Sequence, residues 1–141
     1  EALADDYRQG RLAAGQLAIV ATPRLEGLLA DLHGHHQIED FHYFPVFRRL
    51  APEIGPGIDV LERDHADLTR AGLAARVALR ELRAASAGGD TPTSALAADL
   101  GLAAMSRLCA GILEHLRDEE DLIVPLLLEH DPAGAQPHGE P

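Results

Sequence analysis

Four of the eight histidines in this 141-residue chain fall within residues 33–45, together with two carboxylates. In this segment His35 and Glu39 are four residues apart, and His115 and Glu119 repeat the same spacing near the other end of the chain. Residues four apart lie on one face of an α-helix, about 6 Å apart along its axis, so an imidazole and a carboxylate at this spacing can bind one metal ion together. Two such pairs on facing helices predict a two-metal site.

Each of these residues has a simpler explanation when it is taken alone, as a hydrogen-bonded core histidine or a solvated surface glutamate. Together they are harder to explain, because burying unpaired carboxylates beside several imidazoles costs several kcal/mol per carboxylate unless a cation lies between them. The ligands are nitrogen and oxygen with no thiolate, which favours iron or manganese, with zinc as a substitute. Two ions bridged by Glu39 and Glu119 use this ligand set more economically than one.

Four helices are expected to position these side chains. Apolar residues at helical spacing, with turns rich in Pro and Gly between them, predict helices over residues 1–20, 23–50, 58–85 and 92–130. Thr22-Pro23 and Thr91-Pro92 have the residue types of helix starts, and Pro45 is expected to kink or loosen the last turns of the second helix. The second and third helices then carry two predicted inward stripes: Leu25, Leu28, Leu32, His35, Glu39, His42 and Val46, and Ile58, Leu61, His65, Leu68, Gly72, Ala75, Leu79 and Leu82.

Composition and connection lengths favour an all-α fold, an antiparallel up-down four-helix bundle. Leu and Ala dominate the chain and β-branched residues are few, which favours helices over strands. Such bundles build metal sites from side chains that project inward from facing helices. We expect residues 1–130 to form one such bundle and residues 131–141, which are rich in Pro and Gly, to form a mobile tail.

Charge and cysteine content restrict the expected partners and compartment. The formal net charge is −11, which argues against nucleic acid and anionic membranes as partners. No apolar run approaches the roughly 20 residues that span a bilayer, and no signal peptide is visible. The single cysteine, Cys109, forms no internal disulfide and is compatible with a reducing cytoplasm. The sequence thus predicts a cytoplasmic protein, and it names no protein partner.

The order of these motifs resembles the hemerythrin-like (HHE cation-binding) family over roughly residues 25–128. The motifs are His35-His36-Gln37-Ile38-Glu39-Asp40 with Pro45, then Asp64-His65, then His115-Leu116-Arg117-Asp118-Glu119-Glu120 with Pro125. The resemblance implies a four-helix bundle with a non-haem centre of two iron ions, Fe2+ or Fe3+, joined by an oxo or hydroxo bridge. Carried over residue by residue, it implies these metal ligands: His35, His36, Glu39, His65, His115 and Glu119, with the two glutamates bridging.

Two positions depart from the family pattern. The family supplies a histidine from the first helix, but no histidine precedes His33. Matching heights across a turn near residues 20–22 leaves two alternatives: Asp5, Asp6 or Tyr7 substitutes, or the position is open. Oxygen-carrying members have a second histidine one turn after the third-helix ligand, where this chain has Thr69. This argues against a simple oxygen carrier. Two further candidate ligands, less strongly indicated, are His42 and Glu120.

Several functions remain as alternatives. The first is a di-iron protein, an oxidoreductase if turnover occurs, that binds and reacts with dioxygen or peroxide. The second is a module that senses or binds iron, oxygen or nitric oxide without turnover. The third is a ferritin-like carboxylate protein, because Glu39-x-x-His42 and Glu62-x-x-His65 have the Glu-x-x-His spacing of that class. The last is a helical bundle that binds no metal.

Overall fold

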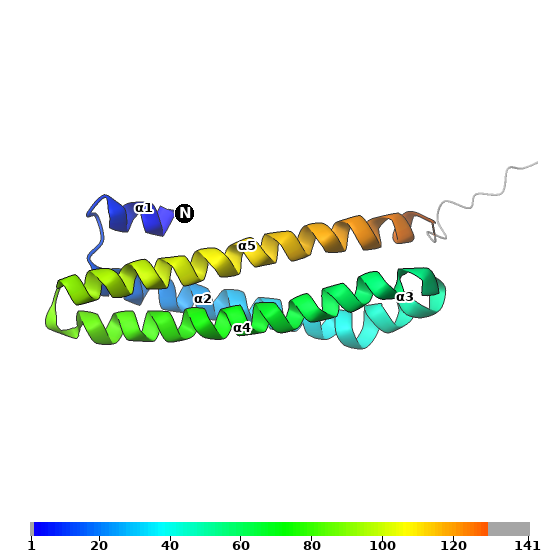
Figure 1. The fold of residues 1–141 in the computed structure, drawn as a ribbon, viewed down its shortest axis with the longest axis horizontal. Coiled ribbons are helices and arrows are strands. Elements are labelled where there is room, and N and C mark those ends of the chain that lie inside the picture. The colour runs from blue at the N-terminus through cyan, green and yellow to red at the C-terminus, as the bar shows by residue number, and fades with distance from the viewer. Residues whose placement is uncertain (1, 130–141) are drawn as a thin grey trace, which may run out of the picture.

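The computed structural model describes residues 2–129, and all regular secondary structure in this range is helical. The helices are α1 (Ala2–Arg8), α2 (Ala14–Ile38), α3 (Phe44–Leu50), α4 (Gly55–Ala85) and α5 (Pro92–Glu129), with short turns η1 (Glu39–Tyr43), η2 (Pro52–Ile54) and η3 (Ser86–Gly88). Because η1 joins α2 to α3 without a break, four helical segments alternate in direction along the bundle (Figure 1). The predicted all-α four-helix bundle is confirmed, and the predicted tail lies outside the described residues.

The first turn of the bundle lies at residues 9–13, earlier than the sequence predicted. Gly10 adopts a φ of +70°, which ends α1 there. The backbone N–H of Ala14 then donates to Asp90 Oδ1 at 3.2 Å, so a side chain from the distant α4–α5 loop caps the start of α2. Thr22 does not begin a helix, because its hydroxyl donates to the Ala18 carbonyl at 2.7 Å and α2 continues through Pro23. As a result α1 is short and lies at one end of the bundle (Figure 1).

Residues 39–43 form a π-helical turn, in which the Phe44 N–H donates to the Glu39 carbonyl five residues earlier. Pro45 accounts for this widening, because its ring has no N–H and would collide with the carbonyl four residues before it. The extra residue rotates the inward face of the helix, so Phe44 and Phe47 are buried. The predicted stripe was therefore wrong beyond Glu39, where His42 and Val46 are exposed. It was also wrong before Glu39 at Leu28 and His35, which are exposed, whereas the neighbouring His36 is buried.

The core consists of two apolar clusters with a polar layer between them. On α4 all eight residues of the predicted stripe are buried, with Ile58 and Leu61 in one cluster and Leu68 to Leu82 in the other. Gly72 allows α2 to approach closely, since a Cβ there would lie 2.6 Å from Leu29 Cδ2. His65 is the only member of this stripe that separates the two apolar clusters.

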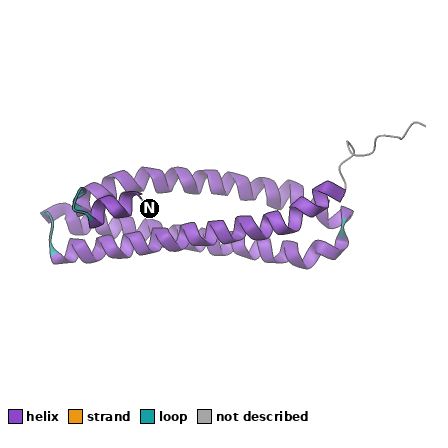
Figure 2. Cartoon of the chain, turned by 90° about the horizontal axis from the view of Figure 1, so that it is seen from above, coloured by secondary structure: helices purple, strands orange, loops and turns teal. Residues whose placement is uncertain are grey.

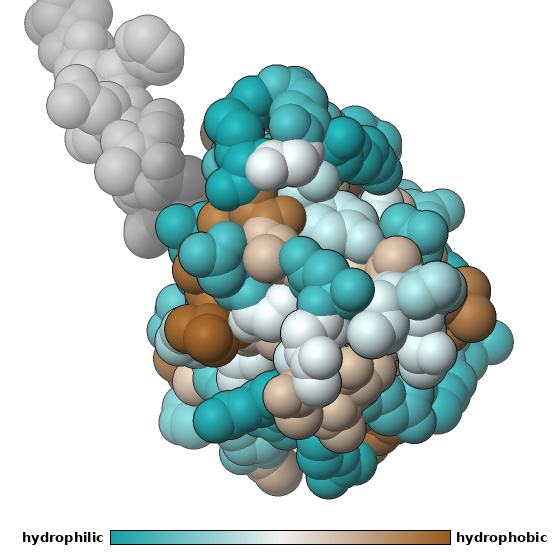
Figure 3. All heavy atoms as spheres, turned by 90° about the vertical axis from the view of Figure 1, so that its left-hand side faces the viewer, coloured by the Kyte–Doolittle hydropathy of each residue, from teal (hydrophilic) through white to brown (hydrophobic). Residues whose placement is uncertain are grey.

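Helix α5 is the longest element, and it pairs chiefly with α4 along the length of the bundle (Figure 2). By length and composition alone, its segment Pro92–Leu128 is long and apolar enough to cross a membrane. Within the most apolar part of this segment, 22% is buried inside the bundle. The sequence analysis did not anticipate a segment of this length and apolar composition. Seen from the α1 end, the surface is largely hydrophilic and apolar side chains show mainly at the flanks (Figure 3).

Candidate metal centre

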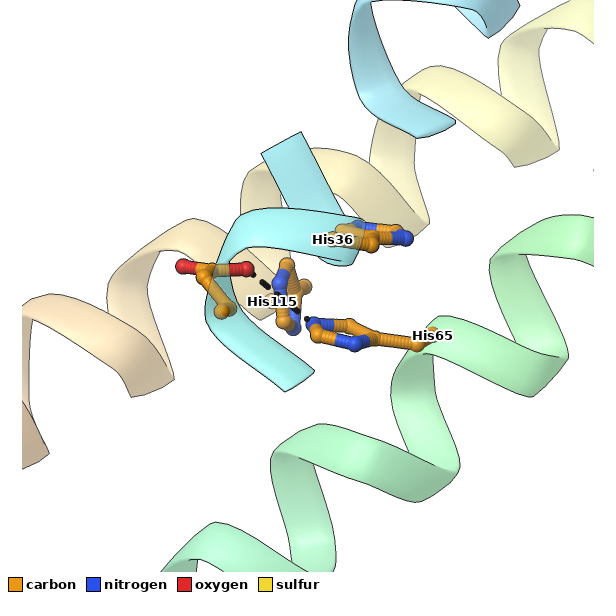
Figure 4. Close-up of side chains that lie close together, drawn as sticks. His36, His65 and His115 are labelled. Atoms are coloured by element: carbon orange, nitrogen blue, oxygen red, sulfur yellow. Dashed lines mark ion pairs between the residues drawn. The ribbon is translucent and has the colours of Figure 1, made fainter. Parts of the chain in front are cut away.

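Three imidazoles from three helices meet in the polar layer between the two apolar clusters (Figure 4). His36 comes from α2, His65 from α4 and His115 from α5, and all three are buried. The rings of His36 and His65 stack with centroids 3.7 Å apart, and His115 meets His65 edge-on at 4.8 Å. Three imidazoles packed so tightly bring several ring nitrogens into one small volume.

Glu39, the first residue of the π-helical turn, completes this group. Its side chain is 4% exposed, and its Oε2 lies 3.4 Å from His65 Nε2. One potential ligand atom from each of the four side chains lies within 4.8 Å of the other three. We call this group the inner cluster: His36, Glu39, His65 and His115.

The inner cluster has the chemistry that a metal ion needs. Five of its buried polar atoms have no hydrogen-bond partner: His36 Nε2, Glu39 Oε2, His65 Nε2, and both ring nitrogens of His115. Buried polar atoms are almost always paired, and leaving one unpaired costs about 1–3 kcal/mol. A cation bound among these nitrogens and the carboxylate would satisfy most of them at once, so the residues present fit a divalent metal.

A second group shares Glu39 and lies on the solvent side of the first. His35 Nε2 is 3.2 Å from Glu39 Oε1 and 3.6 Å from Glu119 Oε2, and these three residues form a second possible ligand set. We call this group the outer cluster: His35, Glu39 and Glu119. The side chain of His35 is 44% exposed and that of Glu119 is 22% exposed, so water reaches this half of the centre.

The two carboxylates that face each other, Glu39 and Glu119, share one proton. Burial and the neighbouring Glu39 carboxylate raise the pKa of Glu119 to about 7. Burial also acts to raise the pKa of Glu39, but its contacts with His65 and Glu119 and the nearby imidazoles outweigh burial and lower it. The proton therefore resides on Glu119, and Glu39 is the ionised member of the pair.

The imidazoles of the inner cluster differ in their affinity for protons. Burial, followed by repulsion from the other imidazoles, lowers the pKa of His36 to about 4, and the same two causes lower the pKa of His115. Burial also acts against protonation of His65, but the carboxylates of Glu39 and Asp40 outweigh it and raise the pKa of His65. At neutral pH His36 and His115 are uncharged and have the lone pairs that metal binding requires.

A cavity of about 290 Å³ lies beside the inner cluster, between α2 and α4. It is mainly apolar and reaches His36 and Thr69, with the Arg76 side chain at its wall. Arg76 is held there by a bidentate ion pair with Glu26. The cavity is large enough for a small molecule next to the buried half of the centre.

The structure does not bring the remaining candidate ligands to either cluster. Asp5 and Asp6 form ion pairs with Arg8 and Arg11, and Tyr7 lies beside Ala14 and Asp90 at the end of the bundle. The reason is the early turn at residues 9–13, which places α1 level with the start of α2. The two remaining candidate ligands are exposed and belong to neither cluster: His42 in the π-helical turn and Glu120 on α5.

The structure does not bring together the residues of the ferritin-like alternative. Glu62 is exposed and its Oε2 accepts a hydrogen bond from Arg48 at 3.0 Å, so it points away from the clusters. His42 lies on the outside of the π-helical turn. Of the two Glu-x-x-His pairs, only Glu39 and His65 reach the centre, and they come from different pairs.

Two aspartates that sequence reasoning did not include among the ligands lie against the histidines. Asp40 Oδ1 is 2.9 Å from His65 Nδ1, and Asp64 Oδ2 is 3.8 Å from His115 Nδ1. Each aspartate is next in sequence to a residue of the inner cluster, Glu39 or His65. That adjacency was the available signal, but which helix face each aspartate occupies depends on the π-helical turn and on how the helices pack.

Comparison with known proteins agrees with this geometry. The sequence model of one family, described as the Hemerythrin HHE cation binding domain, matches residues 2–127. No curated protein and no solved structure gave a match. The match covers most of the chain, including every residue of both clusters. The chain therefore belongs to the hemerythrin HHE cation-binding family, and it is a metal-binding module with a candidate His/Glu metal site between its two apolar cores.

Proposed function

We propose that this protein binds two iron ions, one in each cluster with Glu39 between them, and that the loaded centre binds and reacts with dioxygen or peroxide. The observation that carries the proposal is the set of five unpartnered buried atoms in the inner cluster. Iron in such a site supplies reversible change between the ferrous and ferric states. Imidazole and carboxylate ligands without thiolate suit iron in either state.

The residues of the chain divide the remaining work. The neutral imidazoles of His36 and His115 provide nitrogen lone pairs in a space from which the two apolar clusters exclude water. His35 and Glu119 lie on the exposed side, where a small molecule can approach. Because Glu119 holds a proton near neutral pH, binding of a cation there displaces that proton into solvent.

A second function is favoured by the exposure of the outer cluster. A half-exposed ligand set with one histidine is suited to reversible metal occupancy, which an iron sensor requires, and its exposure also gives dioxygen or nitric oxide access to the centre. In that case the centre would respond to iron, dioxygen or nitric oxide without turnover. The two functions share the same metal centre and differ in whether a bound small molecule is converted to product.

Elemental analysis of freshly purified protein tests the shared part of the proposal. We expect two iron ions per chain and near-ultraviolet absorption from a bridged ferric pair. Protein that contains no iron, and that takes up none when ferrous iron is added without oxygen, would contradict the proposal. Addition of peroxide then separates the two functions, because catalytic oxygen release supports turnover, whereas a stoichiometric spectral change supports sensing.

A further inference from the structure

Both ring nitrogens of His65 face a carboxylate, and the two carboxylates belong to consecutive residues. On one side Asp40 Oδ1 lies 2.9 Å from Nδ1, and on the other Glu39 Oε2 lies 3.4 Å from Nε2. A neutral imidazole carries only one N–H, so the two carboxylates compete for it. Whichever nitrogen keeps the proton is lost as a metal donor.

The distances decide this competition in favour of Asp40. A separation of 2.9 Å is that of a normal N–H···O hydrogen bond, whereas 3.4 Å exceeds the usual range of 2.7–3.2 Å. With the proton on Nδ1 and donated to Asp40, the lone pair of Nε2 faces the inner cluster. The Nε2 atom is also one of the five buried atoms that have no hydrogen-bond partner.

We infer that Asp40 is a positioning residue that holds His65 in its Nδ1–H tautomer and so makes Nε2 the metal-donating atom. The role of Nε2 as a metal donor rests on the proposed function, whereas the tautomer of His65 does not. A carboxylate that accepts from the distal nitrogen also fixes the plane of the ring and makes the imidazole a stronger donor. The π-helical turn contributes here, since it directs Glu39 and Asp40 to opposite sides of one ring.

His115 provides an internal comparison. Asp64 Oδ2 lies 3.8 Å from His115 Nδ1, beyond hydrogen-bond distance, and both nitrogens of His115 are unpartnered. Asp64 thus has a similar placement to Asp40 without the bond. Replacing Asp64 should have a smaller effect on its histidine than replacing Asp40 has on His65.

The first test uses protein from which metal has been removed. Long-range 1H–15N NMR spectra at alkaline pH, where the imidazoles are neutral, report the tautomer of each histidine. We expect His65 to be an Nδ1–H tautomer in the wild type and in Asp40→Asn, whose amide oxygen still accepts a hydrogen bond. In Asp40→Ala we expect a substantial Nε2–H population. An unchanged Nδ1–H signal in Asp40→Ala would overturn the inference.

The second test measures affinity for cobalt(II), used as a spectroscopic probe, by competition with a chelator. We expect Asp40→Ala to bind cobalt 10–100-fold more weakly than wild type, the usual cost of losing such a partner, with Asp40→Asn closer to wild type. Asp31→Ala, an exposed aspartate on α2, is the matched control and should match wild type. Equal affinities for Asp40→Ala and Asp31→Ala would also overturn the inference. If wild-type protein binds no cobalt, the proposed function fails, but the tautomer measurement still decides the role of Asp40.

Discussion

The inner and outer clusters share Glu39 and differ in almost everything else. The inner cluster takes side chains from three helices, buries them all between two apolar cores, and contains three imidazoles to one carboxylate. The outer cluster contains one imidazole and two carboxylates, and its non-shared members are open to solvent. Burial keeps His36 and His115 of the inner cluster neutral, whereas paired carboxylates retain a proton in the outer cluster.

These differences indicate that one centre can combine two kinds of metal site. Because the pKa values of His36 and His115 are lowered, protons compete with a metal ion for these nitrogens only at low pH. A half-exposed carboxylate pair makes a site whose occupancy depends on pH and on competing solvent. We therefore expect the inner ion to bind more tightly and the outer ion to exchange first.

The largest effect is expected from replacing the shared residue. Glu39→Gln removes the one carboxylate that belongs to both clusters, so the affinity for both ions should fall. We expect a decrease of more than about 100-fold, because losing a residue that only supports a ligand already costs about 10–100-fold. Metal content after dialysis and cobalt titration measure this. His42→Ala is the control, since His42 is exposed three residues away and belongs to neither cluster. A Glu39→Gln protein that still holds two ions would refute the shared role of Glu39.

A smaller effect, confined to one cluster, is expected from Glu119→Gln. This change removes a ligand of the outer cluster only, so the metal content should fall from two ions per chain to one, and the remaining ion should keep its wild-type affinity. Loss of both ions together in this variant would contradict two separate clusters, because it would show that they form one cooperative site. Titration of metal-free protein with cobalt distinguishes the two outcomes.

The raised pKa of Glu119 predicts a change in stability without metal. The folded chain holds a proton on Glu119 up to about pH 7, whereas the unfolded chain releases it near 4.5, so this group lowers the free energy of unfolding as pH rises between these values. Glu119→Gln has no carboxyl group to titrate at this position, so it removes this loss of stability at higher pH. The variant should match wild type near pH 4.5 and exceed it by about 1–3 kcal/mol at pH 8.

Urea unfolding of metal-free protein at both pH values measures this difference. Comparing the two proteins at each pH cancels the opposite contribution of His36, whose lowered pKa makes stability rise between about pH 4 and 6.5. An equal difference between variant and wild type at both pH values would contradict the proton assignment to Glu119.

The smallest effect is expected from Glu62→Ala. Glu62 pairs with Arg48 at the surface, and such pairs contribute about 0–1 kcal/mol, so metal content should stay at the wild-type value and stability should change little. A loss of metal in this variant would revive the ferritin-like arrangement. Elemental analysis and a single urea curve suffice for the measurement.

Sequence periodicity predicted the inward face of α4 correctly. All eight positions of that stripe are buried, including His65, because Gly55–Ala85 is a regular α-helix whose apolar residues recur without interruption. On α2 the same count was less accurate, because Leu28 and His35 of the predicted stripe are exposed and the adjacent His36 is buried.

The other errors arose where backbone irregularities or distant residues decide the outcome. The π-helical turn adds one residue to the inward repeat, which exposes His42 and buries Phe44, and no count at fixed helical spacing detects it. The start of α2 is capped by Asp90 from another loop, and this contact exists only after the bundle forms. For the same reason the helix-start residues at Thr22 were misleading, and the heights assigned to α1 were wrong.

Anomalous diffraction from crystals of iron-loaded protein tests the central claim most directly. We predict two iron peaks on either side of the Glu39 carboxylate, one among His36, His65 and His115 and the other beside His35 and Glu119. The inner peak should have the higher occupancy after brief chelation. Iron elsewhere in the bundle, or no peak within coordinating distance of Glu39, would contradict a two-ion centre shared by the inner and outer clusters.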